Sequence, residues 1–168
     1  MDEVANHTTP KGFKMIPGWF SWADTLRFGR TVGATPNGRK AGEAISHGAN
    51  PNPGFRKDGA VTAQALGIAR VQPGYGNTAP LQLEFDPKMS AEEGGVDRVL
   101  DVILAHLRLG GTLVNINVLD AETLREANEN PDTHPDLVVR VTGFSAYFPS
   151  LSPAFRQLVV KRLIREAV

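Results

Sequence analysis

Cysteine is absent from the 168-residue sequence. This absence excludes a disulfide framework, a thiolate metal site, an iron–sulfur site on cysteine ligands and a cysteine nucleophile within the chain. Acidic and basic residues balance at 18 each, which removes the usual electrostatic argument for binding nucleic acid or an anionic membrane surface. No apolar run approaches the roughly 18 residues that a membrane span needs. The composition therefore predicts a soluble, globular protein that binds neither nucleic acid nor membrane.

The N-terminal residues carry neither the basic nor the apolar stretch of a signal peptide, so we expect a cytoplasmic protein. Residues 1–11 are polar, and we expect them to form a flexible lead. Residues 12–168 are long enough to form one domain with its own core. The 17 glycines and 12 prolines predict many loops, although they fall short of a disorder signature.

The first third of this domain holds an aromatic cluster followed by turn residues. Several aromatic side chains in so short a segment favour burial, either in a local core or against another chain. Residues 29–59 contain two predicted turns, at 35–38 and 50–54, because proline fixes φ there and glycine or asparagine accepts positive φ. The aromatic residues are Phe13, Trp19, Phe20, Trp22 and Phe28.

The remaining sequence is more regular and predicts an α/β fold, because strand patterns alternate with helix patterns. Gly110 and Gly111 predict the end of a long amphipathic helix, and Asp120 predicts the N-cap of the next one. On the strand between them, Asn115 and Asn117 occupy the face opposite the valines and isoleucine. We predict helices over 61–69, 96–107, 120–128 and from 153, and extended segments over 81–85, 112–119, 137–141 and 144–148.

Familiar cofactor and metal motifs are incomplete in this sequence. Residues 33–40 have the glycine spacing of a phosphate loop, but Arg39 stands where the lysine belongs and no serine or threonine follows. Residues 74–76 lack the third glycine of a dinucleotide fingerprint. The four histidines have no metal-ligand spacing, and His106, inside the long helix, is expected to be structural. We therefore predict no bound cofactor and no metal.

The segment 137–148 consists of an extended run, one glycine and a second extended run. Two arms of about five residues at ~3.3 Å each would hold Gly143 roughly 15 Å from their base. By geometry alone, a glycine at that place is a tight turn at positive φ. The sequence around it, however, resembles the glycyl radical loop of glycyl radical enzymes, from Arg140 through Gly143 to Phe148.

Two further segments extend the resemblance. Residues 110–124 resemble the strand–helix unit that precedes the radical loop in that family, and residues 35–43 resemble a loop further upstream. The matches follow the family's order and spacing over about residues 12–165. Residues 145–148, and the Leu-Ser-Pro that follows at 151–153, resemble the dehydratase, lyase and decarboxylase branches more than pyruvate formate-lyase.

The resemblance implies the C-terminal part of a ten-stranded α/β barrel, which is incomplete on its own. It implies that Gly143 is the radical site, made when a radical-SAM [4Fe–4S] activating enzyme removes one α-hydrogen. This radical is sensitive to oxygen, so the resemblance also implies an anaerobic enzyme. The residues that shape the loop would be Arg140, Val141, Thr142, Phe144 and Ser145.

The family's catalytic cysteine, and the glutamate beside it, are missing from this chain. The first hypothesis is therefore a split enzyme of the lyase class, in which a large barrel subunit carries the cysteine and binds a small-molecule substrate. This chain would then be the radical-storage subunit and would not be catalytic alone. Two alternatives stay open: a spare part that replaces an oxygen-cleaved radical domain of a full-length enzyme, and a non-catalytic binding or regulatory module.

Overall fold

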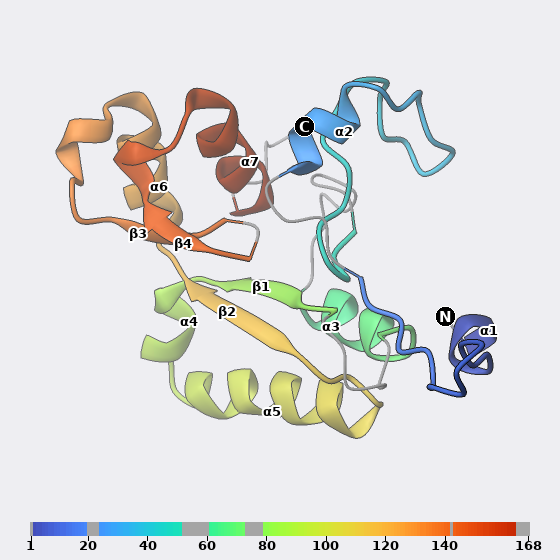
Figure 1. The fold of residues 1–168 in the computed structure, drawn as a ribbon. Coiled ribbons are helices and arrows are strands. Elements are labelled where there is room, and N and C mark those ends of the chain that lie inside the picture. The colour runs from blue at the N-terminus through green and yellow to red at the C-terminus, as the bar shows by residue number, and fades with distance from the viewer. Residues whose placement is uncertain (1, 20–23, 52–60, 73–78, 142, 164–168) are drawn as a thin grey trace.

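The computed structural model describes residues 2–19, 24–51, 61–72, 79–141 and 143–163. Two hydrophobic cores organise this part of the chain. One lies between the first two strands and the helices beside them, and the other lies among the C-terminal elements. Figure 1 shows the first two strands, β1 and β2, between helix α5 and the hairpin of strands β3 and β4.

The first core is built on a β–α–β unit. Strands β1 (Leu81–Phe85) and β2 (Val114–Val118) pair in parallel, and helices α4 (Pro87–Ala91) and α5 (Gly95–Arg108) connect them. A parallel pair needs such a crossover because its strands run in the same direction. Helix α3 (Val61–Ala69) packs against α5 and β1.

The second core joins the C-terminal elements. Helix α6 (Ala121–Glu129) and the 3₁₀ turn η2 (Pro131–Thr133) lead into an antiparallel hairpin, and the turn η3 and helix α7 follow it. Val139, Val141 and Phe148 of the hairpin region are fully buried against α6 and α7. The hairpin strands are β3 (Val138–Arg140) and β4 (Ser145–Tyr147), followed by η3 (Phe148–Ser150) and α7 (Pro153–Leu163).

The N-terminal third contains short helices α1 (Asp2–Ala5) and α2 (Thr25–Gly29) joined by irregular segments. The predicted turn at 35–38 is confirmed: Gly38 adopts φ +92°, and its N–H donates to the Thr35 carbonyl at 3.0 Å. The second predicted turn falls mostly outside the described residues. A β-bridge joins Thr8 to Lys14, and the flexibility of residues 1–11 stays a prediction.

Most of the predicted elements are confirmed, including the two helix ends. Asp120 caps α6 by accepting the Thr123 N–H at 3.0 Å, and Gly110 ends the helical stretch after α5 at φ +97°. The helix and first strand predicted at 61–69 and 81–85 have the predicted bounds. No described helix has the length and apolar character that crossing a bilayer requires.

Two expectations need correction. The hairpin strands have three residues each, so their arms are shorter than the five predicted. The local-core interpretation of the aromatic cluster is wrong for Phe13 and Phe28, which are both exposed, while Phe20 and Trp22 lie outside the described residues.

The sequence left open which face of β2 is covered. In the structure Asn117 on the polar face is buried, whereas Val118 on the apolar face is 60% exposed.

Candidate radical site

Gly143 lies in the turn of the β3–β4 hairpin, at its tip. Its φ is +95°, a conformation that residues with a side chain rarely adopt. A Cβ built at this position would meet no other described atom within 4 Å, and the residue is exposed. The Val141 N–H donates to the Phe144 carbonyl at 2.8 Å and closes the turn. The predicted tight turn is confirmed, and the α-carbon of Gly143 is open to an approaching group.

The other predicted loop residues surround this turn in different ways. Val141 is fully buried and anchors the hairpin in the C-terminal core, whereas Phe144 and Ser145 are exposed. The Arg140 guanidinium donates to the Ser145 hydroxyl across the hairpin at 3.4 Å. Thr142 lies outside the described residues.

Asn117 on β2 ties the parallel strands to the hairpin. The backbone N–H of Arg140 donates to the Asn117 Oδ1 at 3.2 Å, and the Asn117 Nδ2 donates to the Arg140 carbonyl at 3.3 Å. One amide side chain thus satisfies both backbone groups of a strand residue, as a neighbouring strand would. These two hydrogen bonds to the hairpin explain why the polar face of β2 is covered at Asn117.

Arg162 on α7 holds the same strand as well, and shares the Arg140 carbonyl with Asn117. Its guanidinium donates to the Val141 carbonyl at 2.7 Å and to the Arg140 carbonyl at 2.9 Å. These are the last two described carbonyls before Gly143. The Arg162 side chain is 6% exposed, so these bonds form away from water. A planar guanidinium can make both bonds at once, which an ammonium group does less well.

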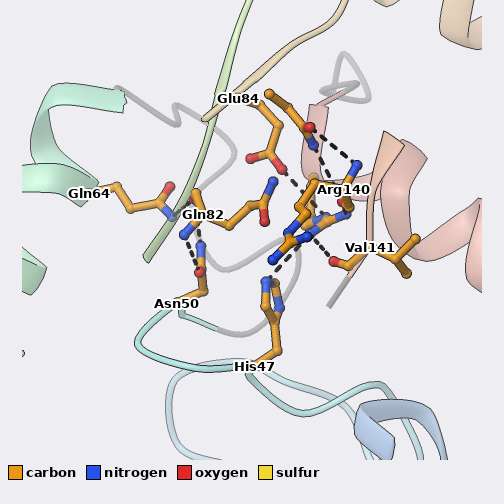
Figure 2. A network of polar contacts seen from close by, with 9 residues as sticks. His47, Asn50, Gln64, Gln82, Glu84, Arg140 and Val141 are labelled. Atoms are coloured by element: carbon orange, nitrogen blue, oxygen red, sulfur yellow. Dashed lines mark hydrogen bonds and ion pairs between the residues drawn. The ribbon is translucent and has the colours of Figure 1, made fainter. Parts of the chain in front are cut away.

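Glu84 and His47 complete the buried polar network shown in Figure 2. The Arg162 Nε lies 3.7 Å from the Glu84 Oε1, and the Arg162 Nη1 lies 3.4 Å from the His47 Nε2. Burial raises the pKa of Glu84, and Arg162 partly offsets that rise. Burial, and then the positive charge of Arg162, lower the pKa of His47 to about 3. His47 is therefore neutral near pH 7.

The network continues along β1 through two amide side chains. Asn50 exchanges two hydrogen bonds with the backbone of Gln82, at 2.7 and 2.8 Å. The Gln64 side chain of α3 donates to the same Gln82 carbonyl at 3.3 Å. Figure 2 shows these groups beside Glu84. Hydrogen bonds therefore link the loop at Asn50 and helix α3 to the strand that carries Glu84.

Sequence reasoning missed Arg162, Glu84 and the role of His47. A sequence signal existed for Glu84 and Asn117, because both stand at polar positions of strand patterns and share one face of a parallel pair. No signal marked Arg162, which is one of several basic residues in its helix and lies 21 residues beyond Val141.

An apolar groove lies on the opposite side of the β1–β2 pair. It has a volume of about 340 Å³ and runs between α5 and the apolar face of β2. Parallel strands are usually covered on both faces, and here the groove leaves Val118 60% and Val96 65% exposed. The apolar residues that line it are Phe85, Val96, Val99, Leu100, Ile103, Ile116 and Val118.

Two other candidate residues are structural. His106 is fully buried, with Nδ1 2.7 Å from the Ala65 carbonyl and Nε2 2.9 Å from Gln72, as expected. The Arg39 guanidinium donates to the carbonyls of its own loop, including that of Glu43 at 2.7 Å, so its donors are not directed at a phosphate. Residues 74–76 lie outside the described residues. Across the described residues, no group of three or more His, Asp or Glu side chains gathers as metal ligands would.

Comparison with known proteins places this geometry in a family. Residues 45–149 match the family model described as "Glycine radical". The chain is 31% identical over 166 residues to indoleacetate decarboxylase of Tractidigestivibacter scatoligenes, covering 98% of the chain and 19% of that protein. It is 34% identical over 137 residues to isethionate sulfite-lyase of Nitratidesulfovibrio vulgaris, covering 80% of the chain and 16% of that protein.

Solved structures agree. The glycerol dehydratase of Clostridium butyricum superposes with a TM-score of 0.79 at 30% identity, over 96% of this chain and 20% of that chain. A glycyl radical enzyme of Archaeoglobus fulgidus superposes with a TM-score of 0.78 at 30% identity, over 99% and 21%. The chain thus spans about a fifth of the length of these relatives. Its fold is one part of their α/β barrel, incomplete on its own.

Proposed function

Because the chain belongs to the glycyl radical enzyme family, we propose that it stores a radical at Gly143 for catalysis by a partner that carries a cysteine. The observation that carries the proposal is the open α-carbon of Gly143 at a hairpin tip, in a chain with no cysteine of its own.

The chemistry explains the choice of glycine. A radical-SAM activating enzyme removes one hydrogen atom from the Gly143 α-carbon, and the unpaired electron spreads over the adjoining amide nitrogen and carbonyl. A side chain would twist this centre and block approach to it, and none is present. The radical then takes a hydrogen atom from a thiol, which restores glycine and leaves a thiyl radical. At the end of the cycle the thiyl radical takes the hydrogen atom back from the Gly143 α-carbon, which restores both the thiol and the glycyl radical.

The partner supplies what the described residues lack. The thiol must come from outside this sequence, and the exposed hairpin tip leaves room for it. The groove between α5 and β2 is an apolar surface large enough to accept further elements of a barrel. We propose that a large cysteine-bearing barrel subunit packs against this groove and also binds the small-molecule substrate.

The reaction class follows the named relatives. They include decarboxylases, a dehydratase and sulfite-lyases, which break C–C, C–O or C–S bonds. We propose a lyase-type reaction for the complex, with this chain as its radical-bearing part.

Anaerobic activation tests the proposal. The chain would be co-purified with a cysteine-bearing barrel protein, treated with the activating enzyme and its S-adenosylmethionine, and examined by electron paramagnetic resonance. We expect a glycyl doublet in the wild-type protein and none in Gly143→Ala. A doublet that persists in Gly143→Ala rejects the site.

The choice of partner separates the split enzyme from the repair function. A split enzyme gives activity only with a barrel that has no radical loop of its own. A spare part restores activity to a full-length enzyme that has been cut at its own loop by oxygen. Full reactivation of such a cut enzyme, with no activity on a loop-less barrel, would favour repair.

A further inference from the structure

We propose that Arg162 is a positioning residue that fixes where Gly143 lies. This inference deepens the proposed function and concerns the same site. The Arg162 guanidinium on α7 holds the strand that leads to Gly143, and Glu84 is its counter-ion. Arg162 does not touch the reacting α-carbon.

The hairpin of β3 and β4 is small. A three-residue strand pair is too short to hold its own tip in place, since isolated hairpins are marginally stable at best. External contacts must therefore define the position of the turn. Two side chains from distant segments, Asn117 and Arg162, form hydrogen bonds with the end of β3 and the residue after it. Close by in the sequence, the Ser150 hydroxyl donates to the Tyr147 carbonyl of β4 at 2.7 Å.

The two contacts differ in reach. Asn117 bonds only the backbone of Arg140, three residues before Gly143. Arg162 bonds the carbonyls of both Arg140 and Val141, so its contact comes one residue closer to Gly143. A fork of two donors on successive carbonyls restricts rotation of the strand about its own axis, which a single bond does not.

The ion pair keeps the fork in place. Burying a charged group away from water is costly unless an opposite charge lies nearby. The Glu84 carboxylate, 3.7 Å from the Arg162 Nε, supplies that charge and stabilises Arg162 in the network. The two Nη atoms of Arg162 donate to the hairpin carbonyls. Glu84 stands on β1 in register with Asn117 on β2, so both holding contacts rest on the same parallel pair.

The first test needs no radical. Hydrogen–deuterium exchange would be measured on the full chain, in the assembly in which it purifies, for wild type, Arg162→Gln and Arg162→Lys. In Arg162→Gln we expect exchange in the hairpin to rise at least tenfold, while exchange in α6 stays unchanged. Arg162→Lys should recover part of the protection, because an ammonium group can still donate to one carbonyl. The matched control is Lys161→Gln, an exposed residue of the same helix.

The pattern of exchange distinguishes positioning from general support. The hairpin and α6 share one hydrophobic core, so a loss of packing would raise exchange in both. Equal increases in the hairpin and α6, or no increase in the hairpin, would overturn the proposal. If Arg162→Gln fails to fold, Glu84→Gln keeps the side-chain volume, removes the counter-ion and should raise hairpin exchange in the same local pattern. Unchanged hairpin exchange in Glu84→Gln would count against this role of Arg162.

The second test uses the activated complex. Activity would be divided by the number of unpaired spins, so that radical formation and radical use are measured separately. We expect Arg162→Gln to lose at least tenfold in activity per spin, because a displaced α-carbon meets the thiol less well, and Lys161→Gln to lose nothing. Equal activity per spin in Arg162→Gln and wild type would overturn the proposal. Absence of a doublet in the wild-type protein would instead reject the proposed function, and the exchange test would still decide the role of Arg162.

Discussion

The α-carbon of Gly143 combines two properties that only glycine supplies. It adopts φ +95°, and it presents no side chain to an approaching atom. Because no described atom apart from the chain neighbours lies within 4 Å of an added Cβ, a substitution here meets backbone strain but no clash with the described residues. The stability cost and the functional cost of replacing Gly143 can therefore be measured apart.

We predict that Gly143→Ala lowers the free energy of unfolding by only about 1 kcal/mol, the cost of placing a side chain in the left-handed region. The same variant should lose the radical doublet completely. Urea unfolding followed by circular dichroism measures the first quantity, and spin counting after anaerobic activation measures the second. A loss of several kcal/mol would mean that the turn is held by contacts beyond those described.

His47 provides a pH-dependent contribution to stability. Its pKa is lowered from 6.5 to about 3 in the folded chain, so the folded state resists protonation that the unfolded state accepts. Stability from this group is present above pH 6.5 and is lost as pH falls toward 3. Glu84 acts in the opposite sense, because its raised pKa makes the folded state take up a proton first.

We predict that lowering the pH from 6.5 to about 5 costs the wild-type chain about 2 kcal/mol more than it costs His47→Gln. Glutamine keeps a neutral polar group beside Arg162 and removes the titration. Urea midpoints at matched pH values test this prediction. Glu84 is present in both proteins, so it cancels in the difference. Parallel pH curves for the two proteins would contradict the assignment.

At the scale of elements, the helices differ in how tightly their glycines are packed. Gly67 lies in α3 with no described atom within 4 Å of an added Cβ, whereas a Cβ on Gly95 in α5 would overlap the Met89 carbonyl oxygen. Both residues belong to helices that build the first core. The pair offers a direct comparison between helix propensity and steric fit.

We predict that Gly67→Ala raises the free energy of unfolding by about 0.5–1 kcal/mol, since alanine is the better helix former. Gly95→Ala should lower it by about 1–3 kcal/mol, because α4 and α5 must move apart. Chemical denaturation of both variants beside wild type measures these changes. A destabilised Gly67→Ala would show that a segment outside the described residues, or a partner, occupies the space beside α3.

At the scale of the whole molecule, the two faces of the β1–β2 pair have opposite roles. The polar face is covered by the hairpin and α7 through Asn117, Glu84 and Arg162. The apolar face is covered by α3 and α5 over β1, while over β2 it opens into the groove. The polar face therefore carries the contacts that hold the hairpin, and the apolar face carries the groove proposed for the partner.

We predict that Val118→Asp leaves the stability of the chain within about 0.5 kcal/mol of wild type, because Val118 is already 60% exposed. The same variant should weaken binding to the barrel partner at least tenfold, equivalent to about 1.4 kcal/mol. Val71→Asp, an exposed valine outside the groove, is the control. Binding would be measured by titration of the partner, and equal affinities for the two variants would exclude the groove as the docking surface.

The sequence by itself determined the local features of this protein. The periodicity of α5, the Asp120 cap, the glycine after α5 and the turn at Gly143 all depend on residues within a few positions of one another. The resemblance to the family's radical loop was also evident in the sequence, but it depended on several segments in the family's order and spacing, because a glycine between two extended runs by itself predicts only a tight turn.

Only the tertiary structure decided which face of β2 is covered and which side chains hold the hairpin. Arg162 meets carbonyls 21 and 22 residues away, and Glu84 approaches it from a strand still further back in the sequence. Alternation places Asn117 opposite the apolar residues of its strand, but it cannot say which of the two faces another element will cover. Such choices depend on packing between distant segments, and that packing is set by the fold as a whole.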